Sequence, residues 1–144
     1  MRKISATMSS IPLLIVFGTL LSISTLCTSQ TYKLFQEKHI VNPGPIDCNS
    51  TIRNRGIKGP GGKCKSINTF MHKARPFTGD YFCDGDCSNH SLTCPHNFDL
   101  TICTLKKGKR PPNCIYSQST MSNSQVCLAC KKNVPVHFAH AGHC

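Results

Sequence analysis

Long apolar runs are nearly absent from this sequence. The main one, Ile11–Leu21, follows the basic residues Arg2 and Lys3 and precedes small residues at positions 27 and 29. This order is typical of a secretory signal peptide covering residues 1–29, with cleavage expected between Ser29 and Gln30. A retained membrane anchor is the alternative, but the run is shorter than the roughly 18 apolar residues that a membrane span needs. No second run of this length follows, so we expect residues 30–144 to form a soluble, secreted chain.

Acidic residues are also scarce. Six Asp and Glu oppose 17 Lys and Arg in the whole chain, and loss of residues 1–29 would leave 15 basic side chains and a formal charge of +9. The sequence contains no internal repeat, and the 115 residues from 30 to 144 fit one domain. A secreted domain this basic is expected to meet polyanions, namely nucleic acid, anionic lipid or acidic glycans. Charge alone does not choose among them.

Cysteine, by contrast, is abundant. Of the 11 cysteines, Cys27 lies in the expected signal peptide, and ten remain. An even number in a short secreted chain indicates a disulfide framework of five bridges, each worth about 2–4 kcal/mol. Zinc is the alternative, because Cys127 and Cys130 have the spacing of half a zinc site, but an oxidising compartment favours disulfides. We therefore expect no metal, and the spacing leaves the connectivity open.

The apolar spacing predicts helices early and strands later. Residues 31–40 form a helical pattern in which Leu34, Phe35 and Lys38 lie three and four apart, and Phe35 shares a face with His39. A second helix is predicted over residues 47–55, with Asp47 as its N-cap. Strands are predicted over residues 67–71, 98–102, 115–116, 126–129 and 134–138. The predicted class is α+β, with an antiparallel sheet.

The last of these strands presents a histidine. Val134, Val136 and Phe138 alternate with polar or small residues, so one face would be apolar and His137 would project from the other. His39 and Lys65 are two further candidates. Together, two histidines and a lysine could supply an acid–base pair and a cation that stabilises developing negative charge. Each alone is weak evidence, because most histidines are structural or solvated.

Three sequence blocks around these candidates resemble one family. The blocks Phe35–Ile40 (FQEKHI), Cys64–Phe70 (CKSINTF) and Pro135–Phe138 (PVHF) resemble, in order, those of the pancreatic ribonuclease (ribonuclease A) superfamily. Gln30, nine residues before His39, and the terminal Cys144 are similar to the onconase-like amphibian branch. The resemblance implies a small disulfide-rich fold in which short helices pack on a bent antiparallel sheet.

The resemblance also implies a chemistry. His39 would be the general base that removes a proton from the ribose 2′-hydroxyl, and His137 the general acid that protonates the departing 5′-oxygen. Lys65 would stabilise the transition state. The implied enzyme is a metal-independent endoribonuclease that needs no cofactor and cleaves single-stranded RNA, after pyrimidines, through a 2′,3′-cyclic phosphate.

Further positions follow from the same blocks. Lys38, Asn68, Thr69 and Phe138 are implied to bind substrate, although ordinary strand packing would also explain Thr69 and Phe138. Gln30 is implied to cyclise to pyroglutamate. The implied disulfides are Cys48–Cys103, Cys64–Cys114, Cys83–Cys130, Cys87–Cys94 and Cys127–Cys144. Asn49 and Asn89 begin N-glycosylation sequons.

The sequence departs from the family where bases are selected. Ile102 replaces an aspartate common in the family, and Lys131 and Lys132 stand where an acid commonly follows the cysteine. Ala139 is a departure of another kind, because it replaces the aspartate that orients the histidine in pancreatic members, which the onconase-like branch also lacks. We therefore expect cleavage with a loosened base preference.

A second class of function also fits the composition. The basic runs at 106–110 and 131–132 suit a cationic host-defence protein, antimicrobial, cytotoxic or lectin-like, that binds anionic cell-surface glycans or lipids and for which RNA cleavage is secondary. In either case we expect a monomer.

Overall fold

The computed structural model describes residues 32–73, 83, 91–131 and 134–144. The expected signal peptide at 1–29, the pyroglutamate at Gln30, Cys87, the sequon at Asn89 and Lys132 lie outside the described residues. Within the described ranges, no helix is long and apolar enough to cross a membrane.

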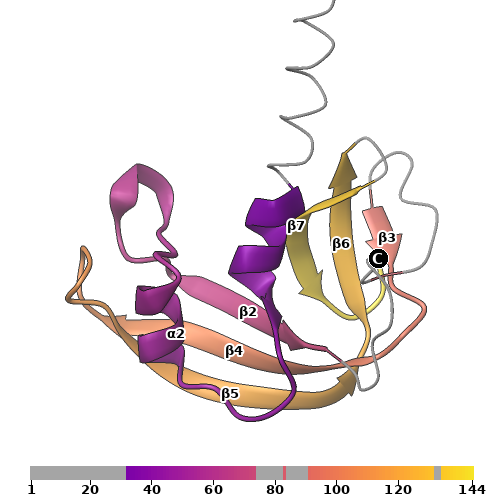
Figure 1. Ribbon diagram of the computed structural model, residues 1–144, viewed down its shortest axis with the longest axis horizontal. Coiled ribbons are helices and arrows are strands. Elements are labelled where there is room, and N and C mark those ends of the chain that lie inside the picture. The colour runs from indigo at the N-terminus through magenta and orange to yellow at the C-terminus, as the bar shows by residue number, and fades with distance from the viewer. Residues whose placement is uncertain (1–31, 74–82, 84–90, 132–133) are drawn as a thin grey trace, which may run out of the picture.

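The described residues form two sheets and two α-helices (Figure 1). A helix over residues 32–39 comes first. The further elements, in chain order, are β1 (Ile40–Val41), α2 (Cys48–Asn54), the 3-10 turn η1 (Pro60–Gly62), β2 (Ile67–His72), β3 (Ser91–Thr93), β4 (Phe98–Lys107), β5 (Ile115–Ser124), β6 (Val126–Lys131) and β7 (Val134–Ala141). One sheet has the order β1-β2-β4-β5 and the other the order β3-β6-β7. In Figure 1, β4 and β5 curve beneath the helix 32–39, and β6 and β7 rise beside it.

The predicted α+β class is confirmed, with one addition. The pairs β2–β4, β4–β5, β3–β6 and β6–β7 are antiparallel, but β1 pairs with β2 in parallel, with Ile40 opposite Met71. Strands β1 and β3 were not predicted, because two or three residues are too few to show an alternation. The parallel pair extends the chain directly from the helix 32–39 into the sheet, which fixes the end of that helix against β2.

Both predicted helices are present. Asp47 is the N-cap of α2, and its Oδ1 accepts a hydrogen bond from the Ser50 N–H at 2.7 Å. In the first helix Phe35 and His39 are both buried, as their spacing predicts. Leu34, which the same pattern included, is half-exposed. Adjacent helical residues project about 100° apart, so Leu34 and Phe35 cannot both face the core.

The core has two apolar clusters, which lie on opposite faces of β2. Met71 belongs to the first, which joins the helix 32–39 to both sheets through Phe35, Ile40, Phe98, Leu100, Val126 and Leu128. Phe70 belongs to the second, which packs α2 on the four-stranded sheet through Ile52, Ile57 and Tyr116. Successive strand residues point to opposite faces. Strand β2 is therefore buried on both sides and provides a firm platform.

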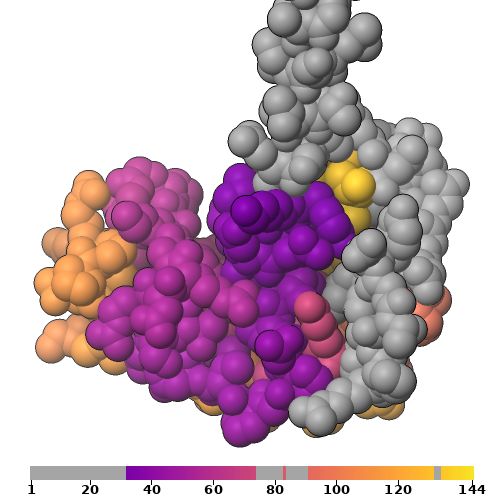
Figure 2. Space-filling model, in the orientation of Figure 1, coloured from indigo at the N-terminus to yellow at the C-terminus, as the bar shows by residue number. Residues whose placement is uncertain are grey.

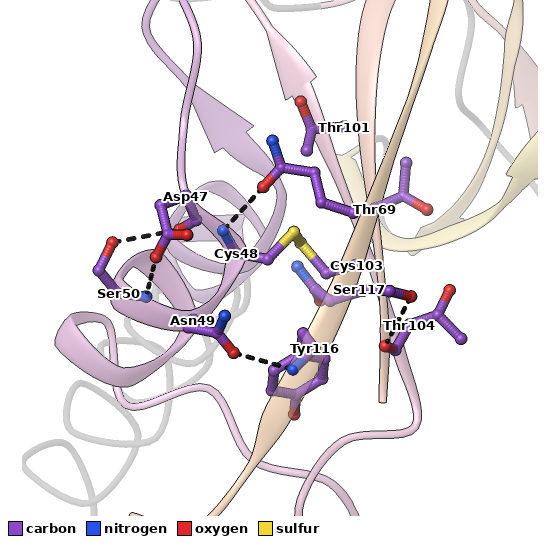
Figure 3. The surroundings of a disulfide bond; sticks show 12 residues. Asp47, Cys48, Asn49, Ser50, Thr69, Thr101, Cys103, Thr104, Tyr116 and Ser117 are labelled. Atoms are coloured by element: carbon purple, nitrogen blue, oxygen red, sulfur yellow. Dashed lines mark hydrogen bonds between the residues drawn. A yellow bond between two sulfur atoms is a disulfide. The ribbon is translucent and has the colours of Figure 1, made fainter. Parts of the chain in front are cut away.

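Helix α2 is tied to the sheet by covalent and polar bonds (Figure 3). Cys48 forms a disulfide with Cys103 of β4, and the Cys48 N–H donates to Gln118 Oε1 at 3.1 Å. The Tyr116 N–H donates to Asn49 Oδ1 at 2.8 Å. Asn49, the first residue of a sequon, is thus part of this anchor and is half-buried.

Three predicted disulfides are present and two are not. The structure joins Cys48 to Cys103, Cys64 to Cys114, and Cys127 to Cys144. The predicted bridges Cys83–Cys130 and Cys87–Cys94 are wrong, because Cys83 is bonded to Cys94. Cys130 is also disulfide-bonded.

The register of β3 explains the correction. Thr93 lies opposite Cys127, and the Cys94 N–H donates to the Val126 carbonyl at 3.1 Å. Cys130 lies four residues farther along β6, about 13 Å away at roughly 3.3 Å per residue. A disulfide needs Cα atoms within about 7 Å of each other. Cys83, held beside Cys94 at a Cα–Cα distance of 5.4 Å, is at the wrong end of β6 to meet Cys130.

Candidate active site

His39 is the most strongly constrained side chain of the site. It ends the helix 32–39, is 4% exposed, and its Nδ1 lies 2.9 Å from the carbonyl oxygen of Thr69 on β2. A carbonyl can only accept a hydrogen bond, so Nδ1 must hold the proton. In the neutral ring, Nε2 is then unprotonated. The fold thus selects the tautomer in which Nε2 can accept a proton from a substrate.

The surroundings keep His39 neutral near pH 7. The pKa of His39 falls from 6.5 to about 4, chiefly because burial removes the solvation of the charged ring. The bond to the Thr69 carbonyl raises the pKa, while the charges on Lys65, His137 and Lys38 lower it further. His39 is therefore available as a base at every pH above about 4.

Two aromatic rings enclose the imidazole. The centroid of the Phe35 ring lies 5.3 Å from that of His39, and the Phe138 ring of β7 is stacked on His39 at 5.7 Å. Phe138 is half-buried and packs against the first core cluster. These contacts hold the ring in place between the helix and the second sheet.

Asn68 links the two lysines of the site. The Lys65 ammonium donates to Asn68 Oδ1 at 2.7 Å, and Asn68 Nδ2 donates to the Lys38 carbonyl at 2.9 Å. Asn68 is fully buried, so both ends of its amide are oriented by partners. The pKa of Lys65 is lowered by partial burial and then by the charge of Lys38. The hydrogen bond to Asn68 fixes the position of this ammonium.

His137 approaches from the other sheet. It lies on β7 opposite Ala129 and is exposed, whereas Val134, Val136 and Phe138 are half-buried, as the alternation predicts. Its charge acts on the pKa of His39. The site is thus assembled from a helix, one strand of each sheet and Lys65, which lies two residues before β2.

Strand β2 also contributes Thr69 to this region. Thr69 is 8% exposed and lies opposite Ile102 of β4, so an aliphatic side chain stands where the family commonly has a carboxylate. Lys131 is exposed at the end of β6, and Ala139 is exposed on β7.

The structure brings together the site residues that were predicted from the sequence. His39, Lys65, His137, Lys38, Asn68, Thr69 and Phe138 all belong to this cluster or to the strands that build it. Phe35 was not predicted as a site residue, although its spacing of four from His39 was the available signal. The bridging role of Asn68 was not predicted either, because its partner Lys38 is 30 residues away.

The fold and the cluster define a small, disulfide-bonded α+β protein in which two histidines and a lysine come together. The sequence profile of the pancreatic ribonuclease family matches residues 30–139. The chain belongs to the pancreatic ribonuclease family and is a ribonuclease, with RNA as its substrate.

Individual relatives agree with this assignment. The oocytes ribonuclease of Aquarana catesbeiana is 40% identical over 132 residues, which cover 92% of this chain and 96% of that protein. The crystal structure of green turtle egg white ribonuclease superposes with a TM-score of 0.58 at 28% identity, covering 77% of this chain and 98% of the other. Amphinase, titled a cytotoxic ribonuclease from Rana pipiens oocytes, superposes with a TM-score of 0.55 at 30% identity, covering 79% and 99%.

Proposed function

We propose that this chain is an endoribonuclease that cleaves single-stranded RNA by transphosphorylation, without a metal, and that His39, His137 and Lys65 perform the chemistry. The observation that supports this most is the state of His39. Its neutral ring is fixed by the Thr69 carbonyl with Nε2 unprotonated, beside Lys65. A buried neutral imidazole of this kind suits a general base.

The reaction follows from these groups. His39 Nε2 removes the proton of the ribose 2′-hydroxyl, and the oxygen forms a bond to the adjacent phosphorus. The bond from phosphorus to the 5′-oxygen breaks, and His137 gives that oxygen a proton. Lys65 stabilises the negative charge on the phosphoryl oxygens in the transition state. Water then opens the 2′,3′-cyclic phosphate with the roles of the histidines reversed. DNA lacks the 2′-hydroxyl and would bind without reacting.

Base selection is proposed to rest on Thr69 and Phe138, with a preference for pyrimidines. Thr69 can bond to a pyrimidine edge, and Phe138 can line the pocket. Ile102 offers the Thr69 hydroxyl no hydrogen-bond acceptor, and Lys131 places a cation where an acid is common. These two residues support a looser preference than that of members with carboxylates.

Secretion and processing of the chain are also part of the proposal. Residues 1–29 are proposed as a signal peptide and residues 30–144 as the secreted, extracellular domain, a monomer with Gln30 as pyroglutamate. Asn49 and Asn89 are proposed glycosylation sites. The apolar run at 11–21 and the number of cysteines support secretion.

The test is cleavage of the dinucleotide uridylyl-adenosine by wild type and by His39→Ala, His137→Ala and Lys65→Ala. Each variant is expected to lose about 10²- to 10⁴-fold in kcat, and only wild type should release cyclic phosphate rapidly. His140→Ala is the matched control, since His140 is exposed on the same strand as His137 and its Nδ1 bonds only locally, to the Ala141 carbonyl. Equal rates for wild type and His137→Ala would contradict the mechanism.

A cationic host-defence role is a second proposal, with anionic cell-surface glycans or lipids as partners. The charge of the chain supports it, and so does the likeness to amphinase, a cytotoxic ribonuclease. The test is the effect of His137→Ala on cells or bacteria. Damage that persists without cleavage would favour this role, and damage that disappears with cleavage would refute it.

A further inference from the structure

Arg55 links α2 to the helix that carries His39. It is the C-cap residue of α2, and its Nη1 donates hydrogen bonds to the Glu37 carbonyl at 2.8 Å and to the Ile40 carbonyl at 2.6 Å. In Figure 2 the helix 32–39 and α2, coloured indigo to purple, lie side by side on one face of the molecule. One cationic group therefore holds the backbone two residues before His39 and one residue after it.

Both carbonyls lie at the end of the helix 32–39. The last four carbonyl groups of an α-helix have no partner within the helix, and this end carries partial negative charge. A guanidinium is always charged and donates several hydrogen bonds, so it suits this position. Without Arg55, the carbonyls of Glu37 and Ile40 would bind water instead, and the end of the helix would be held less firmly.

Arg55 is itself placed by β2. Its guanidinium lies over the ring of Phe70, 5.8 Å from the centroid, and Phe70 is fully buried. A cation over the face of an aromatic ring is attracted to it. Thr69, the residue before Phe70, provides the carbonyl that binds His39 Nδ1. The backbone around His39 and the ring of His39 are thus held against adjacent residues of one strand.

Two other roles for Arg55 fit these contacts less well. An ion pair would need a carboxylate, but the Glu37 carboxylate lies 3.9 Å from Lys33, and Arg55 takes the backbone oxygen of Glu37 instead. A role limited to α2 would keep the side chain on its own helix, whereas Arg55 bonds to residues 15 and 18 positions earlier in the chain.

We propose that Arg55 is a positioning residue for His39, which fixes the backbone on both sides of the imidazole so that the ring keeps its bond to Thr69 and turns Nε2 toward the substrate. The inference rests on the proposed function, because cleavage depends on it only if His39 is the base. The distance from Nδ1 to the Thr69 oxygen is 2.9 Å, and such bonds are lost beyond about 3.5 Å. A backbone shift of less than about 1 Å would therefore free the ring.

The test replaces Arg55 by methionine, which keeps a long apolar stem but donates no hydrogen bond. On uridylyl-adenosine at pH 7, kcat should fall about tenfold while KM changes less than about twofold, because a misplaced base slows the reaction without weakening substrate binding. Arg53→Met is the matched control. It removes the same charge from an exposed position of the same helix, and its kcat should stay within about twofold of wild type.

A spectroscopic readout separates positioning from a general loss of stability. The nitrogen-15 NMR shifts of a neutral imidazole differ between the tautomers protonated at Nδ1 and at Nε2. At pH 7, His39 should show the first tautomer alone in wild type and in Arg53→Met, and a mixture of both in Arg55→Met, with amide spectra showing that each protein is folded. Arg55→Gln keeps a donor but is shorter and uncharged. It should show a smaller admixture, and it carries the test if Arg55→Met does not fold.

Several results would overturn the inference. These are an equal loss of kcat in Arg53→Met, or either the fall in kcat or the change of tautomer without the other. A rise in KM at constant kcat would also overturn it and assign Arg55 to substrate binding. The NMR comparison needs no RNA, so it tests the hold on His39 even if wild type cleaves nothing, a result that would refute the proposed function instead.

Discussion

Lowering the pH from 7 to 4 should destabilise the folded protein through His39. The pKa of this residue is about 4 in the folded chain and 6.5 in its unperturbed state. Between these values the unfolded chain binds a proton that the folded chain does not, so the free energy of unfolding rises with pH. The stabilisation that comes from keeping His39 neutral is fully present above pH 6.5. It is lost as the pH falls from 6.5 to about 4, and below about pH 4 His39 causes no further change in the free energy of unfolding.

The size of the effect follows from the two pKa values. Each unit of difference corresponds to about 1.4 kcal/mol, so the separation between 6.5 and about 4 gives about 3 kcal/mol. This is a large share of the roughly 5–15 kcal/mol that stabilise a typical domain. The physical origin is mainly burial, with the cations Lys65, His137 and Lys38 adding to it.

The assay is denaturant unfolding at several pH values with the disulfides intact, for wild type and His39→Asn. Asparagine cannot titrate but can still donate to the Thr69 carbonyl. Asp47, whose pKa is lowered by hydrogen bonds from Ser50, also makes stability fall at low pH, but it does so equally in both proteins. Wild type should lose about 3 kcal/mol more than the variant between pH 7 and pH 4. Parallel curves would refute the low pKa of His39.

Two further predictions concern a disulfide and base choice. Replacing Cys64 and Cys114 by alanine opens a loop of 50 residues and should lower the free energy of unfolding by about 4 kcal/mol in denaturant titrations. A loss below about 1 kcal/mol would mean that hydrogen bonds alone hold together the two segments that carry these cysteines. Ile102→Asp places a carboxylate opposite Thr69. The carboxylate can accept a hydrogen bond from the threonine hydroxyl, and the hydroxyl oxygen is then free to accept one from uracil N3–H. Cuts after uridine should then rise about fivefold relative to cuts after cytidine in an oligonucleotide that contains both, and an unchanged ratio would contradict this geometry.

Features set by nearby residues could be predicted from the sequence. The cap at Asp47 depends on Ser50, three residues away, and the shared face of Phe35 and His39 depends on helical spacing. The alternation in β7 likewise placed His137 opposite its apolar neighbours. In each case the physical cause lies within one or two turns of chain or within one strand.

Features set by long-range pairing could not be predicted this way. Strand β5 continues through an exposed polar stretch to Ser124, where no apolar alternation marks it, because β4 supplies its hydrogen bonds. The partner of Cys94 depends on the register of β3 against β6, and three residues encode no register that a sequence pattern reveals. The family resemblance gave the right partners for three bridges, Cys48–Cys103, Cys64–Cys114 and Cys127–Cys144, and failed for Cys94, where this register decides.

Strand β2 positions most of the residues of the site. Lys65 leads into it, Thr69 belongs to it, and it holds His39 by a backbone carbonyl and Lys38 by the Asn68 amide. His137 alone among the proposed catalytic groups belongs to the other sheet. A small rotation between the sheets would leave His39, Lys65 and Thr69 in fixed relation and change their distance to His137. The positions of the proposed base and of the proposed acid would thus be separately adjustable within one fold, and the Phe138 ring against His39 limits how far the two sheets can part.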